Sequence, residues 1–268
     1  AMNMPHYLAG WHASGVLGTM GSAAAAARML RLDVPRTEMA LGIAGSLASG
    51  VRENLGSMTK PLHAGNAAHN GVKAAQLAAH GFTAARSILE GQYGFCRLFG
   101  GGAEPKWAEL TDHLGAPWEI TEPYGYAIKP YPACGGTHPA IEGILALARA
   151  HDLRPADVEQ VRVGVTALAP RILTHHRPAT GLAGKFSMEY CMAAGVIDRR
   201  MGLEQFADEK VAAPVAQALM RRVEMYVHPE LKDNTEFAAH VSVHLKDGRA
   251  VEQRVMLARG KPARPMSR

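Results

Sequence analysis

The chain has 268 residues, of which 47% are hydrophobic and 20% are charged, and its formal net charge is +5. A chain of this length can bury a sizeable core and fold as one or two domains. Its basic residues form no dense run and only 6% of the residues are aromatic, so nucleic acid is not the obvious partner. The sequence also has no apolar stretch of roughly 20 residues and no basic-then-apolar leader, so we expect a cytoplasmic protein without a membrane partner.

The N-terminal half is predicted to be helical and rich in small residues. Apolar periodicity predicts helices at Ser22–Leu32, Thr37–Ser49 and Asn66–His80, with Gly81 ending the last one. The run Ala23–Ala27 is typical of helices that pack closely. This half of the chain therefore predicts a helical domain.

Gly15, Gly18 and Gly21 form a series that resembles a dinucleotide-binding loop only superficially. Their spacing is GxxGxxG rather than GxGxxG, no strand pattern precedes them, and no Walker-type GK[ST] follows. Helix packing is the better interpretation of these glycines.

The stretch GSMTKPLHAG, residues 56–65, carries the densest chemistry in the chain. Pro61 suits the first turn of a helix, which would place Lys60 at the helix entrance, where free N–H groups and the helix dipole favour an anion. Ser57 and Thr59 can donate hydrogen bonds, and His63 follows about one turn later. The pattern predicts a site for a carboxylate or another small anion. The alternative is a solvated lysine at an ordinary helix start.

The C-terminal half changes to a mixture of strands and helices. Alternating residues predict strands at 158–165, 222–227, 238–246 and 249–255, and Asp247-Gly248 predicts a type I′ hairpin between the last two. Helical patterns lie at 139–150, 186–198 and 208–220. The expected fold class is mainly α with an α+β part, a small sheet with helices packed on it.

The three cysteines, Cys96, Cys134 and Cys191, form no CxxC pair, which is typical of a reducing compartment. Cys134 and His138 have a spacing compatible with a metal, but no second pair supports a zinc site. We therefore expect no metal and no organic cofactor.

Four ordered segments resemble the MmgE/PrpD family. They are GWHASGVLGTMGSAAAAARMLRLD from Gly10, GSMTKPLHAGNAAHNG from Gly56 with its continuation GFTAARSILEGQYGF, KPYPACGGTHPAIEGIL from Lys129, and GKFSMEYCMAAGVIDRR from Gly184. The family includes 2-methylcitrate dehydratases, cis-aconitate decarboxylases and iminodisuccinate epimerases. The resemblance covers nearly the whole chain.

The resemblance implies a specific domain order. It predicts a helical domain at 1–110 that is incomplete at its N-terminus, a linker at 111–125, an α+β lid at 126–258, and at 259–268 the start of a missing C-terminal helical segment. The missing N-terminal segment supplies an aspartate and a further histidine in relatives. Homodimers are usual in the family, and the active site is expected in the cleft between the domains.

The resemblance also implies four catalytic residues, Lys60, Lys129, Tyr190 and His12. From the residues alone, Lys129 has even odds of being a surface lysine, Tyr190 is a core tyrosine in an apolar helix, and His12 is a packed histidine. Two neighbouring cations can lower a lysine pKa toward the range that suits a general base.

Six further residues are implied to bind substrate: Ser57, Thr59, His63, Cys134, His138 and Lys185. Cys134 stands where some relatives place a histidine, and a thiol is the poorer proton carrier at neutral pH. His138 has equal claims to structure and site, and Lys185 is implied to help place the loop.

The implied chemistry is removal of a proton next to a carboxylate of a small di- or tricarboxylate, with the developing charge stabilised by lysines and hydrogen-bond donors. We predict a hydro-lyase similar to 2-methylcitrate dehydratase. The alternatives are an epimerase or decarboxylase of the same family, or an inactive truncated chain that binds carboxylates or pairs with a complete subunit.

Overall fold

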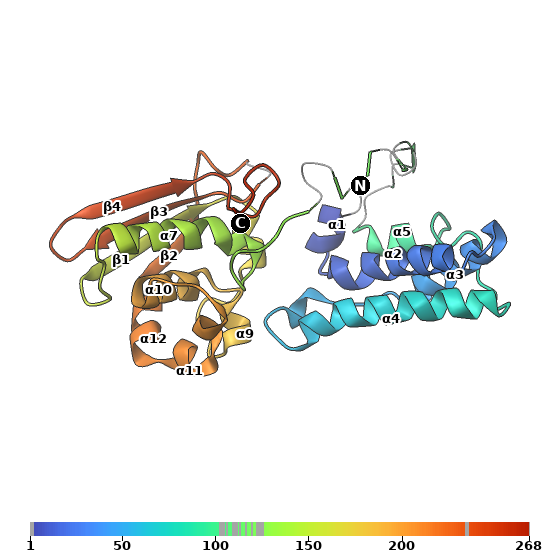
Figure 1. Ribbon diagram of the computed structural model, residues 1–268, viewed down its shortest axis with the longest axis horizontal. Helices are drawn as coiled ribbons and strands as arrows, with labels where there is room; N and C mark the ends of the chain where they lie inside the picture. Colours follow the sequence, from blue (N-terminus) through green and yellow to red (C-terminus); the bar gives the residue numbers. More distant parts are fainter. Residues whose placement is uncertain are drawn as a thin grey trace. The chain divides into compact units, whose positions relative to one another are not determined.

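The computed structural model describes residues 3–101, 126–233 and 236–267, together with 105, 107–108, 112, 114–115, 117–118 and 120–121. It forms two compact units, Ala1–Ala116 and Pro117–Arg268, each described here by itself (Figure 1). Among the described residues, no helix combines the length and hydropathy needed to cross a bilayer.

Over the described residues of the first unit, the named secondary-structure elements are all helices. Its elements are α1 (Asn3–Leu8), α2 (Ala13–Met29), α3 (Val34–Leu47), the short 3-10 helix η1 (Arg52–Asn54), α4 (Thr59–Ala79) and α5 (Phe95–Phe99). The helices α2, α3 and α4 pack against one another (Figure 1). Their shared core consists mainly of alanines, including Ala23, Ala27, Ala74, Ala75 and Ala78.

Small residues let α2 and α4 approach closely. A Cβ atom at Gly71 would lie 2.3 Å from Ser22 Cβ and 2.5 Å from Ala23 N, far inside van der Waals contact. A Cβ at Gly18 would lie 3.3 Å from Ala67 Cβ, whereas one at Gly21 would meet nothing within 4 Å. The interpretation of the glycine series as helix packing therefore holds for Gly18 at the contact between α2 and α4.

The three long helices begin earlier than the sequence pattern predicts. In α3, Asp33 Oδ1 accepts a hydrogen bond from Arg36 N at 3.0 Å and Pro35 lies in the first turn, so the helix starts with a capped turn. Helix α4 begins at Thr59 and places Lys60 in its first turn. Pro61 already predicted a helix entrance at Lys60, so for α4 only the apolar periodicity, which begins at Asn66, put the start too late.

The second unit combines a four-stranded sheet with helices. Its elements are η2 (Gly135–Thr137), α7 (His138–Ala150), β1 (Val158–Val165), α8 (Ala169–Ile172), α9 (Gly181–Gly184), α10 (Met188–Asp198), η3 (Leu203–Phe206), α11 (Asp208–Ala212), α12 (Pro214–Met220), β2 (Val223–Val227), β3 (Ala239–Leu245) and β4 (Ala250–Val255). The predicted fold class, mainly α with an α+β part, is confirmed.

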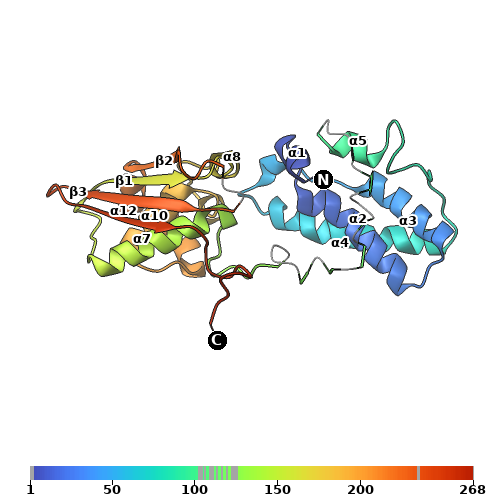
Figure 2. The same ribbon diagram turned by 90° about the horizontal axis from the view of Figure 1, so that it is seen from above.

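The strand order in the sheet is β2-β1-β3-β4. Strands β1 and β2 are parallel and register Val161 with Val223, whereas β3 pairs antiparallel with both β1 and β4. Helix α7 packs against β3 and β4, and α10 packs against α7 and β2 (Figure 2). Gly195 allows this packing, because a Cβ there would lie 2.6 Å from Ile144 Cγ2. The apolar face of the sheet is thereby buried under helices.

Two predictions of local structure are wrong. The helix predicted over 208–220 is interrupted, since Ala213 has ψ 134° before Pro214 and separates α11 from α12. The pyrrolidine ring of a proline disfavours the helical region for the residue before it.

The predicted type I′ turn is also replaced by another geometry. Gly248 has φ +86°, but Asp247 is not among the described residues with positive φ. Gly248 N donates to Leu245 O at 3.0 Å, and Leu245 N donates to Arg249 O at 2.8 Å. The loop is thus a three-residue turn with glycine at the left-handed position. Asp247 Oδ1 stabilises it by accepting a hydrogen bond from Arg249 N at 3.0 Å.

Candidate functional site

A pair of buried histidines lies in the helical unit. Nδ1 of His12 is 2.9 Å from Nδ1 of His63, and their ring centroids are 5.1 Å apart. Both side chains are 7% exposed. His12 immediately precedes α2 and His63 lies in the second turn of α4, so the contact between these two helices brings the pair together.

Backbone hydrogen bonds and a glycine hold this pair in place. His12 N donates to Gly50 O at 3.0 Å, and His12 O accepts from Gly15 N at 2.9 Å. Gly50 has φ +134°, and a Cβ there would lie 3.3 Å from His63 Cγ. Glycine therefore supplies both the backbone conformation and the space beside the His63 ring.

The surroundings of His12 keep its ring neutral. Burial is the largest cause that lowers the pKa of His12 from 6.5 to about 4, followed by the nearby His63, Lys60, Arg52 and His6. A neutral imidazole carries one N–H and one lone pair, so it can donate one hydrogen bond, and its bare nitrogen can accept a proton.

The start of α4 supplies the lysine and the hydroxyls that the sequence singled out. Lys60 N donates to Ser57 O at 3.3 Å. Ser57 Oγ donates to Asn54 O at 2.8 Å and accepts from Thr59 N at 3.2 Å. The Ser57 hydroxyl thus stabilises the turn that leads into the helix. Thr59 N and Lys60 N are thus used within this turn, and Pro61 has no N–H, so the free N–H groups expected from the sequence are not present here. The Lys60 ammonium and the helix dipole are what favour an anion at this position.

In the second unit, Lys129 and His138 share one backbone acceptor. Lys129 Nζ donates to Ala133 O at 3.1 Å, and His138 Nε2 lies 3.2 Å from the same oxygen. His138 is 4% exposed. Burial lowers its pKa from 6.5 to about 4, opposed by the Ala133 hydrogen bond and reinforced by the charge of Lys129. His138 is therefore also neutral at pH 7.

Lys129 and His138 line a cavity of about 170 Å³. Arg259 and Lys261 line the same cavity, and sequence reasoning missed both. They are brought there because Ile128 N donates to Gly260 O at 2.8 Å. Lys261 Nζ also pairs with Glu236 Oε2 at 2.7 Å. The basic run after the last predicted strand was a signal for this site, but only the pairing of distant backbone segments connects it to Lys129.

The KPYPAC and KFS segments, far apart in the sequence, lie side by side. Cys134 N donates to Lys185 O at 2.8 Å. Lys185 Nζ lies 5.8 Å from the centre of the Phe206 ring, and Thr137 Oγ1 donates to Cys134 O at 2.7 Å. Cys134 and Lys185 are thereby grouped near His138, while the prediction that this group shares a cleft with His12 and Lys60 stays a prediction.

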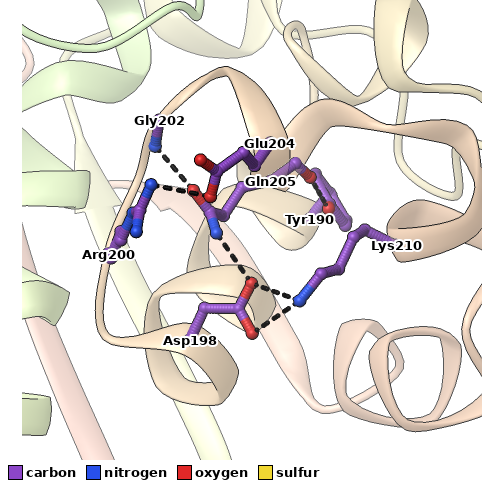
Figure 3. A network of polar contacts seen from close by, with 7 residues as sticks. All are labelled: Tyr190, Asp198, Arg200, Gly202, Glu204, Gln205 and Lys210. Carbon is purple, nitrogen blue, oxygen red and sulfur yellow. Dashed lines mark hydrogen bonds and ion pairs between the residues drawn. The ribbon is translucent and has the colours of Figure 1, made fainter.

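Tyr190 belongs to a polar network inside the second unit (Figure 3). Its side chain is 1% exposed and its hydroxyl donates to Gln205 O; burial raises its pKa. The Gln205 side chain accepts from Gly202 N at 2.8 Å and donates to Asp198 Oδ2 at 2.9 Å, and Lys210 pairs with the same carboxylate at 2.9 Å. This geometry gives the Tyr190 hydroxyl a structural partner, and its catalytic role stays a prediction.

Two buried titratable residues were not singled out from the sequence. His6 is fully buried, and its Nδ1 lies 2.7 Å from Phe99 O. Glu189, 7% exposed, lies inside the KFS motif and bonds Ser187 Oγ at 3.2 Å and His176 Nδ1 at 2.8 Å. The sequence did contain a signal for Glu189, because it is a charged residue within an apolar helical run. A buried carboxylate needs hydrogen-bond partners.

Over the described part of the chain, no group of three or more His, Cys, Asp or Glu side chains is placed to hold a metal ion. The site residues instead form two sets, each with a neutral buried histidine beside a lysine. Such sets suit the binding of small anions combined with proton transfer.

Comparison with known proteins identifies the family of this chain. Residues 1–108 match the MmgE/PrpD N-terminal domain and residues 131–268 match the MmgE/PrpD C-terminal domain. The chain therefore belongs to the MmgE/PrpD family, and the resemblance inferred from its four segments is confirmed.

Relatives with curated names are similar over most of this chain. It is 31% identical over 264 residues to cis-aconitate decarboxylase from Aspergillus terreus (strain NIH 2624 / FGSC A1156), a match that covers 92% of this chain and 53% of the relative. It is 27% identical over 264 residues to the Mus musculus enzyme of that name and 28% identical over 263 residues to the Homo sapiens one, each match covering 96% of this chain and 53% of the relative. The chain spans about half the length of these relatives.

Proposed function

We propose that this chain takes part in a lyase reaction on a small di- or tricarboxylate, with decarboxylation of a cis-aconitate-like acid as the first candidate. The observation that carries the proposal is the neutral His12 held close to Lys60 at the start of α4. The names of the relatives favour decarboxylation within that class.

The proposed roles follow from charge and protonation. In the helical unit, Lys60 at the start of α4 would bind a carboxylate. In the second unit, the 170 Å³ cavity lined by Lys129 and Lys261 would by itself also suit a carboxylate. His12 would transfer the proton at the reacting carbon. Loss of CO₂ leaves a pair of electrons on carbon, and a proton taken up from solvent at the bare ring nitrogen of His12 and passed on to that carbon completes the product. These groups stabilise the developing charge without a cofactor.

Dehydration is the second candidate. The same arrangement of lysines and neutral histidine serves proton removal next to a carboxylate followed by loss of water, as in the predicted 2-methylcitrate dehydratase-like reaction. Epimerisation needs proton removal and return on the other face. In each case His12 and Lys60 keep their proposed roles, so the reaction products distinguish the candidates.

A homodimer in a reducing cytoplasm is part of the proposal. Its support is the usual assembly of the family and the cysteine pattern, since Cys96, Cys134 and Cys191 form no disulfide.

The test is proton NMR in D₂O of the purified chain with cis-aconitate, 2-methylcitrate and aspartate-derived acids. Release of CO₂ with deuterium in the product indicates decarboxylation, new vinyl signals from a saturated acid indicate dehydration, and exchange with loss of optical rotation indicates epimerisation. Silence from a folded chain across all the acids would favour the alternative of a carboxylate-binding chain that needs a complete partner.

The variant Lys60→Ala is expected to lose turnover on the order of 10²-fold or more, because one charge that stabilises the transition state is gone. Its circular dichroism should be unchanged. Lys73→Ala is the matched control, since Lys73 is an exposed lysine on the same helix. An unchanged rate in Lys60→Ala would contradict the proposed role of this lysine.

A further inference from the structure

The contact between His12 and His63 restricts which ring nitrogens can carry a hydrogen. The proposed function does not use this restriction. The two Nδ1 atoms are 2.9 Å apart and both rings are almost completely buried. At that distance one nitrogen must carry a hydrogen and the other must present a lone pair. Two N–H groups would clash, and two lone pairs would repel.

When both rings are neutral, this condition makes them opposite tautomers. The ring that donates carries its proton on Nδ1 and has a bare Nε2, whereas the ring that accepts has a bare Nδ1 and carries its proton on Nε2. The pair therefore presents one basic Nε2 and one acidic Nε2–H. The tautomer of either ring determines that of the other.

Positive charges on neighbouring elements disfavour the addition of a second proton to His12. Arg52 comes from η1 and Lys60 from α4, and the positive charge of each disfavours an imidazolium at His12. Together with burial, these charges lower the pKa of His12 to about 4, so the His12 ring is neutral at neutral pH.

We propose that His63 is a positioning residue that fixes the ring orientation and the tautomer of His12 through the Nδ1–Nδ1 hydrogen bond. The inference rests on the proposed function for its catalytic meaning, because only a reacting His12 needs a defined proton on Nε2. It is an alternative to the prediction from the sequence that His63 binds substrate.

The His63 ring is well placed for this role. It lies in α4, which packs along α2, and its ring abuts the position that a Cβ of Gly50 would take at 3.3 Å. A Cβ at Gly15 would lie 3.3 Å from His63 Cβ. Backbone on two sides thus restricts rotation of the ring, and a ring held in this way passes its orientation to its hydrogen-bond partner.

The first test is long-range ¹H–¹⁵N correlation NMR of the full chain labelled with ¹⁵N-histidine at neutral pH. We expect His12 and His63 to show opposite tautomers. In His63→Phe, which keeps a ring but has no nitrogen, the His12 pattern should change to a mixture of tautomers. His69→Asn, at an exposed histidine of the same helix, should leave it unchanged.

Two results would overturn the proposal. One is the same tautomer for both rings in the unmodified chain, a measurement that requires no variant to fold. The other is an unchanged His12 pattern in folded His63→Phe.

The second test measures turnover once a substrate is known. His63→Phe should lower kcat on the order of 10²-fold with little change in KM, and His63→Asn should recover part of kcat because its amide can restore a hydrogen bond to His12 Nδ1. A rise in KM with unchanged kcat would instead support substrate binding by His63 and overturn the positioning role. If no acid reacts, the proposed function fails while the NMR experiment still decides the histidine pair.

Discussion

At the scale of residues, the structure separates side chains that face a ligand-sized space from those that are used inside the fold. Lys129 and His138 line a cavity, whereas the Tyr190 hydroxyl donates to Gln205 O within a buried network. The sequence could not decide whether either side chain faces a cavity or is bonded inside the fold. A motif gives the residue type but not its hydrogen-bond partner.

Tyr190→Phe is expected to lower the free energy of unfolding of the second unit by about 1–2 kcal/mol, because the buried Gln205 carbonyl loses its donor. Urea unfolding of the variant and the parent chain measures the difference. Unchanged stability combined with lost turnover would contradict a structural role and support the catalytic prediction for Tyr190.

At the scale of elements, close contact between α2 and α4 creates the histidine pair. The contact depends on small residues, since a Cβ at Gly71 would overlap Ser22. The sequence predicted that these helices pack closely but could not tell which of the glycines lie in the contact. Periodicity describes one helix at a time, whereas contact depends on how two helices cross.

Gly71→Ala is expected to destabilise the helical unit by about 1–3 kcal/mol, because the added methyl group forces the backbones apart. Gly65→Ala is the matched control on the same helix, since a Cβ there meets nothing within 4 Å. That variant should gain about 0.5–1 kcal/mol from helix propensity. Chemical denaturation measures both, and an equal effect of the two substitutions would contradict the packing argument.

At the scale of the whole molecule, each unit contains one buried histidine whose pKa is lowered to about 4, His12 in the helical unit and His138 in the α+β unit. In the unfolded chain both titrate near 6.5, so between pH 6.5 and 4 the unfolded state binds more protons. Stability is then present in full above about pH 6.5 and falls as the pH falls toward 4.

Each histidine is expected to contribute up to about 3 kcal/mol to this loss. Hydrogen exchange at about pH 7 and about pH 5 can follow the two units separately. His12→Asn should flatten the pH dependence of the helical unit alone, and His138→Asn that of the α+β unit alone. A variant that retains the full pH dependence of its own unit would contradict this origin.

The sequence by itself determined the helical and α+β halves, the family, and the ranges of the four described strands to within one residue at each end. These depend on local periodicity and on motifs that are contiguous in the chain. Helix starts, the break before Pro214 and the geometry at Asp247 depended on local hydrogen bonds and sterics that periodicity does not contain.

Only the tertiary structure decided which side chains meet. His12 and His63 are 51 residues apart, and Arg259 reaches the Lys129 cavity through the backbone bond between Ile128 and Gly260. The physical reason is that hydrogen bonds and cavities form between elements after they pack, and their partners depend on crossing geometry and burial rather than on spacing along the chain.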